Sequence, residues 1–245
     1  MFFKNKAILM IHGFVGGNYD FGNLHNELQL YRKFDVFTFT LPAHDKFIVS
    51  DVKYQEWIDE STKQIEFLIG NGYKEIYLIG HSMGGVIATY LASQYKEVKK
   101  LILAAPAFRY FHFKDGKLDI KSLNTAFKNI PEILKEINTE QIISKILKTP
   151  ISTTLEFTKL VEKYQHCVDN ITCDVLTIHG TNDSIVPSEG TEYVFNNIKS
   201  KTNILINIKD INHDCFINKR SKEINKIIKE FLIKKQKENK EIIEI

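Results

Sequence analysis

Short apolar runs alternate with segments of helical periodicity along most of the chain, and this alternation constrains the fold more than any other feature. The runs are almost continuously apolar, which is typical of strands buried on both faces of a parallel sheet. The predicted strands are Ala7–Ile11, Phe34–Phe39, Ile76–Ile79, Leu101–Ala104, Val175–Ile178 and Ile204–Ile208. Right-handed crossovers between them predict an α/β fold, with helices on both faces of one twisted, mostly parallel sheet of about six strands.

The segments between the runs carry apolar residues three or four positions apart, as a helix with one buried face requires. Phe21, Leu24 and Leu28 follow this spacing in the first such segment. A last helix is expected from Ser221 to about Lys234. The Lys- and Glu-rich remainder, Lys235–Ile245, is predicted to be a solvated, fraying end.

One interval is too long for a simple crossover. About 70 residues separate the strand ending near Ala105 from the one starting near Asp174, whereas a crossover needs roughly a dozen. Apolar residues recur in it at helical spacing, interrupted by Pro131 and Pro150. We therefore predict a helical cap insertion at 108–170, on a core formed by 1–107 and 171–245.

Composition excludes several classes of protein. Of 245 residues, 43% are hydrophobic and 26% charged, which is typical of a globular domain. The net charge of +3 is too small to predict nucleic-acid binding. The three cysteines show no paired framework or metal-ligand spacing, so we expect free, buried or half-buried thiols. No apolar run approaches the ~18–20 residues of a membrane span, and the N-terminal run is too short for a signal peptide, so we expect a cytoplasmic location without a membrane anchor.

The most specific motif is Gly-His-Ser-Met-Gly-Gly at 80–85, placed between a predicted strand and a predicted helix. It contains G-x-S-x-G, in which glycines two positions either side of Ser82 leave room for a cramped turn that raises the serine hydroxyl above the sheet edge. The following helix points its free N–H groups at the same place. In this context Ser82 is predicted to be a nucleophile rather than an incidental serine in a glycine-rich turn.

A serine hydroxyl needs a base to take its proton and a carboxylate to orient that base. His213 follows the last predicted strand, so it should lie at the same sheet edge as Ser82. Asp183 follows the strand Val175–Ile178 and gives the chain order nucleophile, acid, base. Asp210 and Asp214 are the competing carboxylates, although residues so close to His213 in sequence rarely orient an imidazole from behind.

The loop after the first predicted strand is expected to complete an oxyanion hole. His12, Gly13 and Phe14 follow Ala7–Ile11 at the same edge. We assign the two oxyanion donors to the backbone N–H groups of Phe14 and Met83. His12 and His81 are predicted to be structural, hydrogen-bonding residues. The loop lacks the patterns of nucleotide-phosphate cradles.

These segments together resemble the α/β-hydrolase superfamily, and within it the small bacterial carboxylesterases and monoacylglycerol-lipase-like enzymes. The matching segments are HGF at 12–14, GHSMGG at 80–85, G-x-x-D-x-x-V-P at 180–187 and the loop histidine at 213. The resemblance implies Ser82, Asp183 and His213 as a catalytic triad. Two features depart from the family: its N-terminal antiparallel strands are missing or vestigial, because the strand before HGF begins at about residue 7, and its frequent L-P-G-H-G reads Leu-Pro-Ala-His-Asp at 41–45.

The predicted function is hydrolysis of carboxylic esters with short-to-medium acyl chains, through an acyl-enzyme on Ser82 and without a metal or cofactor. A monoacylglycerol lipase or lysophospholipase, and a thioesterase or acyltransferase with the same triad, remain alternatives. A binding protein that has kept the fold without catalysis is disfavoured, because no triad member is missing. The partner is a small acyl ester; no nucleic acid is expected, and the sequence does not determine the oligomeric state. The residues predicted to contact the substrate are Gly13, Phe14, Met83, Phe108, Phe111 and Phe127. Any single aromatic residue among them could instead pack in the core.

Overall fold

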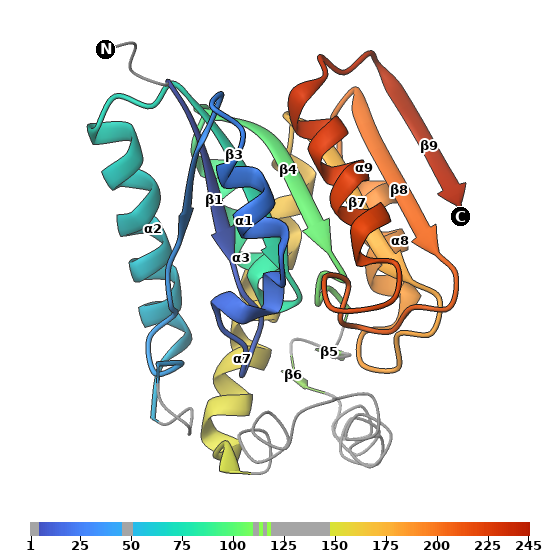
Figure 1. The fold of residues 1–245 in the computed structure, drawn as a ribbon. Helices are drawn as coiled ribbons and strands as arrows, with labels where there is room; N and C mark the ends of the chain where they lie inside the picture. Colours follow the sequence, from blue (N-terminus) through green and yellow to red (C-terminus); the bar gives the residue numbers. More distant parts are fainter. Residues whose placement is uncertain (1–4, 46–50, 110–112, 115–116, 119–147) are drawn as a thin grey trace.

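The computed structural model describes residues 5–45, 51–109, 113–114, 117–118 and 148–245. Its centre is a parallel sheet of seven strands in the order β2-β1-β3-β4-β7-β8-β9 (Figure 1). The strands are β1 (Lys6–Ile11), β2 (Asp35–Thr38), β3 (Glu75–His81), β4 (Val98–Ala104), β7 (Asp174–Gly180), β8 (Thr202–Ile208) and β9 (Asn239–Glu244). The predicted α/β-hydrolase architecture is confirmed, and each of the six predicted strands is present.

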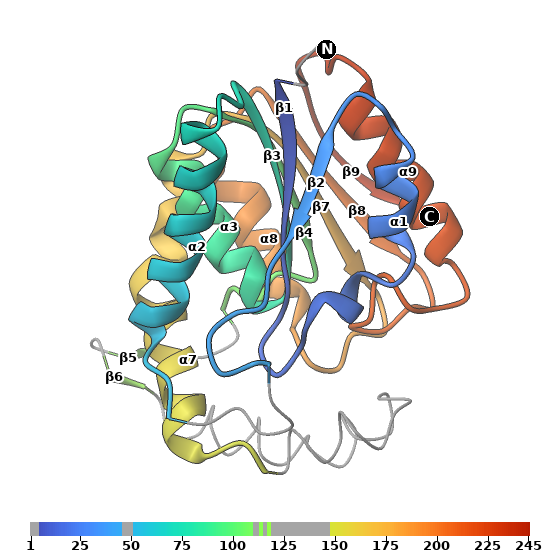
Figure 2. The same ribbon diagram turned by 60° about the vertical axis from the view of Figure 1, so that its left-hand side comes forward.

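Helices cover both faces of the sheet, as Figure 2 shows. One face carries α2 (Tyr54–Gly70), α3 (Met83–Gln94), α7 (Ile151–Tyr164) and α8 (Ser188–Asn197), and the other carries α1 (Leu24–Gln29) and α9 (Ser221–Ile233). Strand β1 explains why the apolar runs are nearly continuous. Its residues Ala7, Leu9 and Ile11 belong to one core cluster, whereas Ile8 and Met10 belong to the cluster on the opposite face.

The C-terminal segment differs from the prediction. Instead of fraying, residues Asn239–Glu244 form β9, which pairs in parallel with β8 from Thr202↔Asn239 to Asn207↔Glu244. The side chains of β9 are exposed or half-buried, and Ile243 packs on the core. Charged side chains on an edge strand discourage pairing with another chain. The same charges hide the strand from a hydrophobicity pattern, so the predicted fraying end was wrong.

The segment predicted to form a cap is described in part. A short antiparallel pair, β5 (Phe113–Lys114) and β6 (Lys117–Leu118), lies within it, and α7 is helical as expected. The buried residues of α7 join the same core cluster as α2 and α3. Residues 119–147 lie outside the described part, so the boundaries of the cap, 108 and 170, stay a prediction.

The carboxyl ends of all seven strands lie at one edge of the sheet, because every pair is parallel (Figure 1). The loops that follow β1, β3, β7 and β8 carry Phe14, Ser82, Asp183 and His213, respectively. Two short 3₁₀ helices, η1 (Asn18–Phe21) and η2 (Gln165–Asn170), complete the described elements. Among the described residues, none of the helices combines the length and apolar character needed to cross a membrane. The three cysteines are free and buried or half-buried, as predicted.

Candidate active site

Ser82 occupies a strained turn between β3 and α3. Its backbone angles are φ 53° and ψ −120°, a conformation that residues with a side chain rarely adopt. The flanking glycines are required by space: a Cβ on Gly80 would lie 2.4 Å from the backbone oxygen of Gly84. A Cβ on Gly84 would lie 2.1 Å from the backbone oxygen of Ile11. The turn therefore has the geometry expected of a nucleophile elbow.

The loop after β1 lies directly against this turn. A Cβ on Gly13 would be only 3.1 Å from Cβ of Ser82. The backbone N–H of Met83, the first residue of α3, has no partner within the helix. Across the described residues, neither the N–H of Met83 nor that of Phe14 donates to a backbone oxygen. These are the two N–H groups that the sequence assigns to an oxyanion hole, and that role stays a prediction.

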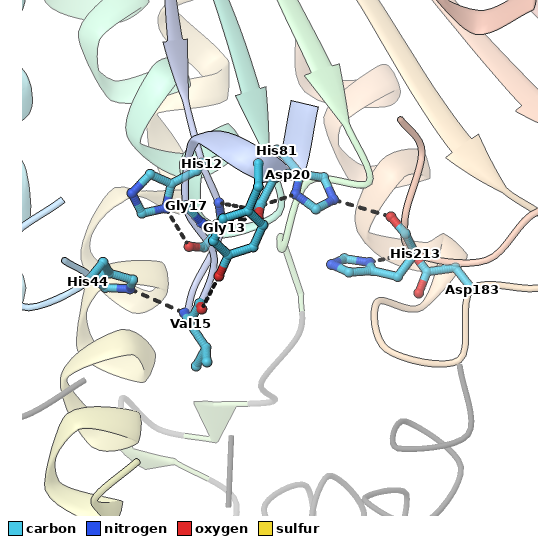
Figure 3. A network of polar contacts seen from close by, with 10 residues as sticks. His12, Gly13, Val15, Gly17, Asp20, His44, His81, Asp183 and His213 are labelled. Atoms are coloured by element: carbon cyan, nitrogen blue, oxygen red, sulfur yellow. Dashed lines mark hydrogen bonds and ion pairs between the residues drawn. The ribbon is translucent and has the colours of Figure 1, made fainter. Parts of the chain in front are cut away.

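His213 and Asp183 form a buried imidazole–carboxylate pair (Figure 3). Nδ1 of His213 donates to Oδ2 of Asp183 over 2.8 Å. The other carboxylate oxygen, Oδ1, accepts the backbone N–H groups of Ile185 and Val186, each over 2.9 Å. The Asp183 side chain is fully buried, so three hydrogen bonds fix the carboxylate and, through it, the orientation of the imidazole.

The pair also sets the charge of both groups. Burial alone would lower the pKa of His213, but the charge and hydrogen bond of Asp183 outweigh burial and raise that pKa. Burial opposes ionisation of Asp183, yet His213 and the backbone donors keep its pKa below the ordinary value. A carboxylate that stays ionised beside the ring stabilises the imidazolium that forms when His213 takes a proton.

The described residues contain no hydrogen bond between the Ser82 hydroxyl and the His213 ring. The two residues nevertheless lie at the same edge, and the ring centroid of His81, the residue before Ser82, is 5.0 Å from that of His213. Both Ser82 and His213 are 8% exposed. In substrate-free enzymes such catalytic contacts are often long and tighten when substrate binds. The catalytic roles of Ser82, Asp183 and His213 stay predictions.

Of the six residues predicted to contact substrate, Gly13 lies against Ser82, and the other five fall into three groups. The Phe14 ring is half-buried and stacks on Phe157 of α7, with centroids 5.0 Å apart. Met83 and Phe108 are fully buried in the core, so their side chains do not line an open surface. Phe111 and Phe127 lie outside the described residues. Phe157 had no motif to reveal it, since its link to Phe14 is made only by the fold.

Two histidines hold the loop after β1 in place. The N–H of Leu41 donates to Nε2 of His12 over 3.0 Å, so Nδ1 of His12 carries the proton that it donates to Gly13. In the same way the N–H of Val15 donates to Nε2 of His44. The predicted structural role of His12 is confirmed, whereas the role of His44, in the segment that departs from the family pattern, was not foreseen.

The seven-stranded parallel sheet and the strained serine turn at its edge define an α/β hydrolase. Residues 50–220 match the Hydrolase_4 family model, described as serine aminopeptidase, S33, and the chain belongs to this family. The matched region contains Ser82, Asp183 and His213. Among the described residues, no group of three His, Cys, Asp or Glu side chains is arranged to hold a metal ion.

The chain is also similar to proteins with named activities. It is 21% identical to a carboxylesterase of Bacillus subtilis, over 94% of this chain and 93% of that protein. It is 23% identical to a thermostable monoacylglycerol lipase of Bacillus sp., over 84% of this chain and 82% of that protein. The crystal structure of a monoacylglycerol lipase from Paleococcus ferrophilus shares the fold, with a TM-score of 0.72 at 18% identity over 94% of both chains. The predicted superfamily is confirmed, and the chain is an esterase- or lipase-like α/β hydrolase.

Proposed function

We propose that the protein hydrolyses carboxylic esters with short-to-medium acyl chains, with Ser82 as the nucleophile. The observation that carries this proposal is the buried pair of His213 and Asp183, joined over 2.8 Å at the edge of the sheet that holds the strained Ser82 turn. A general base, its orienting carboxylate and a serine hydroxyl at the same edge of the sheet are the three parts that acyl transfer to serine needs.

In the first half of the reaction, Nε2 of His213 takes the proton of the Ser82 hydroxyl as its oxygen attacks the ester carbonyl carbon. The backbone N–H groups of Phe14 and Met83 donate to the resulting oxyanion. His213 then gives its proton to the departing alcohol, which leaves an acyl ester on Ser82. In the second half, His213 takes a proton from a water molecule whose oxygen attacks the acyl carbonyl carbon. The bond between that carbon and the Ser82 oxygen then breaks, the carboxylic acid leaves, and His213 returns the proton to Ser82.

The apolar surroundings favour an uncharged acyl chain. The stacked rings of Phe14 and Phe157 lie next to the proposed oxyanion donor, and Phe14 also contacts Trp57 edge-on with centroids 6.0 Å apart. The names of the similar proteins, a carboxylesterase and a monoacylglycerol lipase, support ester substrates. A monoacylglycerol is the second candidate substrate, because it joins an ester to an apolar chain.

The test is a comparison of Ser82→Ala with Ser93→Ala on p-nitrophenyl esters of increasing chain length. Ser93 lies on α3, where its hydroxyl donates to the backbone of Tyr90, so its removal should leave turnover unchanged. Ser82→Ala should reduce kcat by several powers of ten. A fluorophosphonate should label the wild type on the peptide that holds Ser82. Full hydrolysis by Ser82→Ala would refute the assignment, and faster turnover of acyl-CoA than of oxygen esters would favour a thioesterase.

A further inference from the structure

A second imidazole–carboxylate pair lies beside the first (Figure 3). Nδ1 of His81 faces Oδ2 of Asp20 over 3.3 Å, and Nε2 of His81 faces the backbone oxygen of His213 over 3.2 Å. The side chains of His81 and Asp20 are 6% and 10% exposed. Neither residue has a part in the reaction proposed above, although a buried carboxylate costs free energy unless it is well paired.

Asp20 also fastens the loop that carries the proposed oxyanion donor. Its Oδ2 accepts the N–H of Gly13 over 3.0 Å, and its Oδ1 accepts the N–H of Gly17 over 3.1 Å. These two N–H groups flank Phe14 in the chain, so one carboxylate holds the loop from both sides. The fit is close, because a Cβ on Gly16 would lie 2.1 Å from Oδ2 of Asp20.

His81 connects this loop to the other two parts of the site. It is the residue before Ser82, so its ring position is tied to the strained turn. Both of its ring nitrogens face oxygen atoms that can only accept, so it donates to both when each nitrogen carries a proton. Burial would raise the pKa of Asp20, but the hydrogen bond and charge of His81 outweigh burial and lower it. The carboxylate of Asp20 therefore stays ionised and can accept a hydrogen bond from Nδ1 of His81.

Resting on the proposed function, we propose that Asp20 and His81 are positioning residues for catalysis. They join the oxyanion loop after β1, the serine turn after β3 and the backbone of the histidine loop after β8 in one hydrogen-bonded chain. Neither touches the reacting atoms. Their effect is on distance, since catalytic groups must be held to within about 0.5 Å, and a misplacement of about 1 Å can cost about a hundredfold in rate.

The carboxylate of Asp20 also adds a negative charge near the site. The negative charge of Asp20 contributes to the raised pKa of His213, after the larger effects of burial, Asp183 and Asp214. In the part of the chain that the structure describes, the other titratable groups that face His213 are His81, through ring contact, and His179 of β7. Removing the charge of Asp20 should therefore move the acid limb of the kcat/KM profile to lower pH, which a loss of packing alone would not do.

The experiment compares Asp20→Asn with Asp214→Asn, using p-nitrophenyl butyrate hydrolysis across pH. Both variants remove one negative charge near His213, but the hydrogen bonds that hold the N–H groups of Gly13 and Gly17 come from Asp20 and not from Asp214. Asp20→Asn leaves one amide oxygen for two N–H groups and loses the charge opposite His81. We expect a fall in kcat of about ten- to a hundredfold, a KM within about threefold of the wild type and a shifted acid limb. Asp214→Asn should shift the limb while kcat stays near that of the wild type.

A second variant, His81→Gln, tests the proposal independently if Asp20→Asn does not fold. Its kcat should fall by a similar factor. The kcat of the double variant should be no lower than that of the more impaired single variant, because both substitutions interrupt the same series of hydrogen bonds. A full kcat in either folded single variant, or effects that multiply in the double variant, would overturn the proposal. The wild type separates the two hypotheses: if it neither hydrolyses the ester nor reacts with a fluorophosphonate, the proposed function itself fails.

Discussion

Asp183→Asn is the substitution whose consequence the structure predicts in most detail. In the wild type, Oδ1 of Asp183 accepts two backbone N–H groups at 2.9 Å, and Oδ2 accepts Nδ1–H of His213 at 2.8 Å. An asparagine has one oxygen, and the two backbone donors will bind it. Its amide nitrogen then faces Nδ1 of His213 and donates, so the imidazole proton moves to Nε2.

A His213 ring with its proton on Nε2 cannot take the proton of the Ser82 hydroxyl. Replacing the orienting aspartate by asparagine in a serine triad typically lowers kcat about 10⁴-fold, for this reason of tautomer. This factor corresponds to about 5 kcal/mol of transition-state stabilisation. The binding of the acyl chain does not involve Asp183, so KM should change far less than kcat.

The assay is steady-state hydrolysis of p-nitrophenyl butyrate, with Asp210→Asn as the matched control. Asp210 is exposed and has a positive φ of 60°, which asparagine tolerates well, so the control removes a charge from the same sheet edge without strain. Thermal unfolding of both variants checks that they are folded. A folded Asp183→Asn enzyme with more than about a tenth of wild-type kcat, or a control that is equally impaired, would refute the assignment of the carboxylate.

Three further predictions concern pH and stability. Because the pKa of His213 lies above the ordinary value of 6.5, kcat/KM should fall as pH drops through an apparent pKa above 6.5, and an acid limb centred below that value would contradict the pairing. Lys100→Met removes a buried ammonium that donates to three backbone oxygens at the end of α9. We expect this to lower the free energy of unfolding by about 1–3 kcal/mol and Tm by several degrees, with kcat unchanged, relative to the control Lys99→Met at an exposed position. Gly84→Ala should lower Tm sharply, because its Cβ would lie 2.1 Å from a backbone oxygen. The control Gly70→Ala should change Tm little, because a Cβ there has no atom within 4 Å. Equal Tm values for the two variants would show that the turn can relax.

Local patterns in the sequence were sufficient for the layers and for the position of the proposed site. A strand buried on both faces must be apolar at nearly every position, so the five interior strands could be recognised one by one. The edge strand β2 was found within the apolar run Phe34–Phe39. Parallel pairing then places the ends of these strands at one edge, which is why Ser82, Asp183 and His213 could be expected near one another. The glycines around Ser82 carried the signal of a cramped turn in their spacing alone.

Contacts between distant segments were decided by the tertiary structure. Strand β9 has exposed, charged side chains and is stabilised by pairing with the open edge of β8, which no local pattern records. Asp20 and His81 are 61 residues apart, and His81 and His213 are 132 apart, yet they form one hydrogen-bonded chain. The neighbours of a residue in the sequence determine whether it suits a turn, a buried strand or a helix. Which other residue completes its hydrogen bonds depends on how the crossovers bring the loops together at the edge of the sheet.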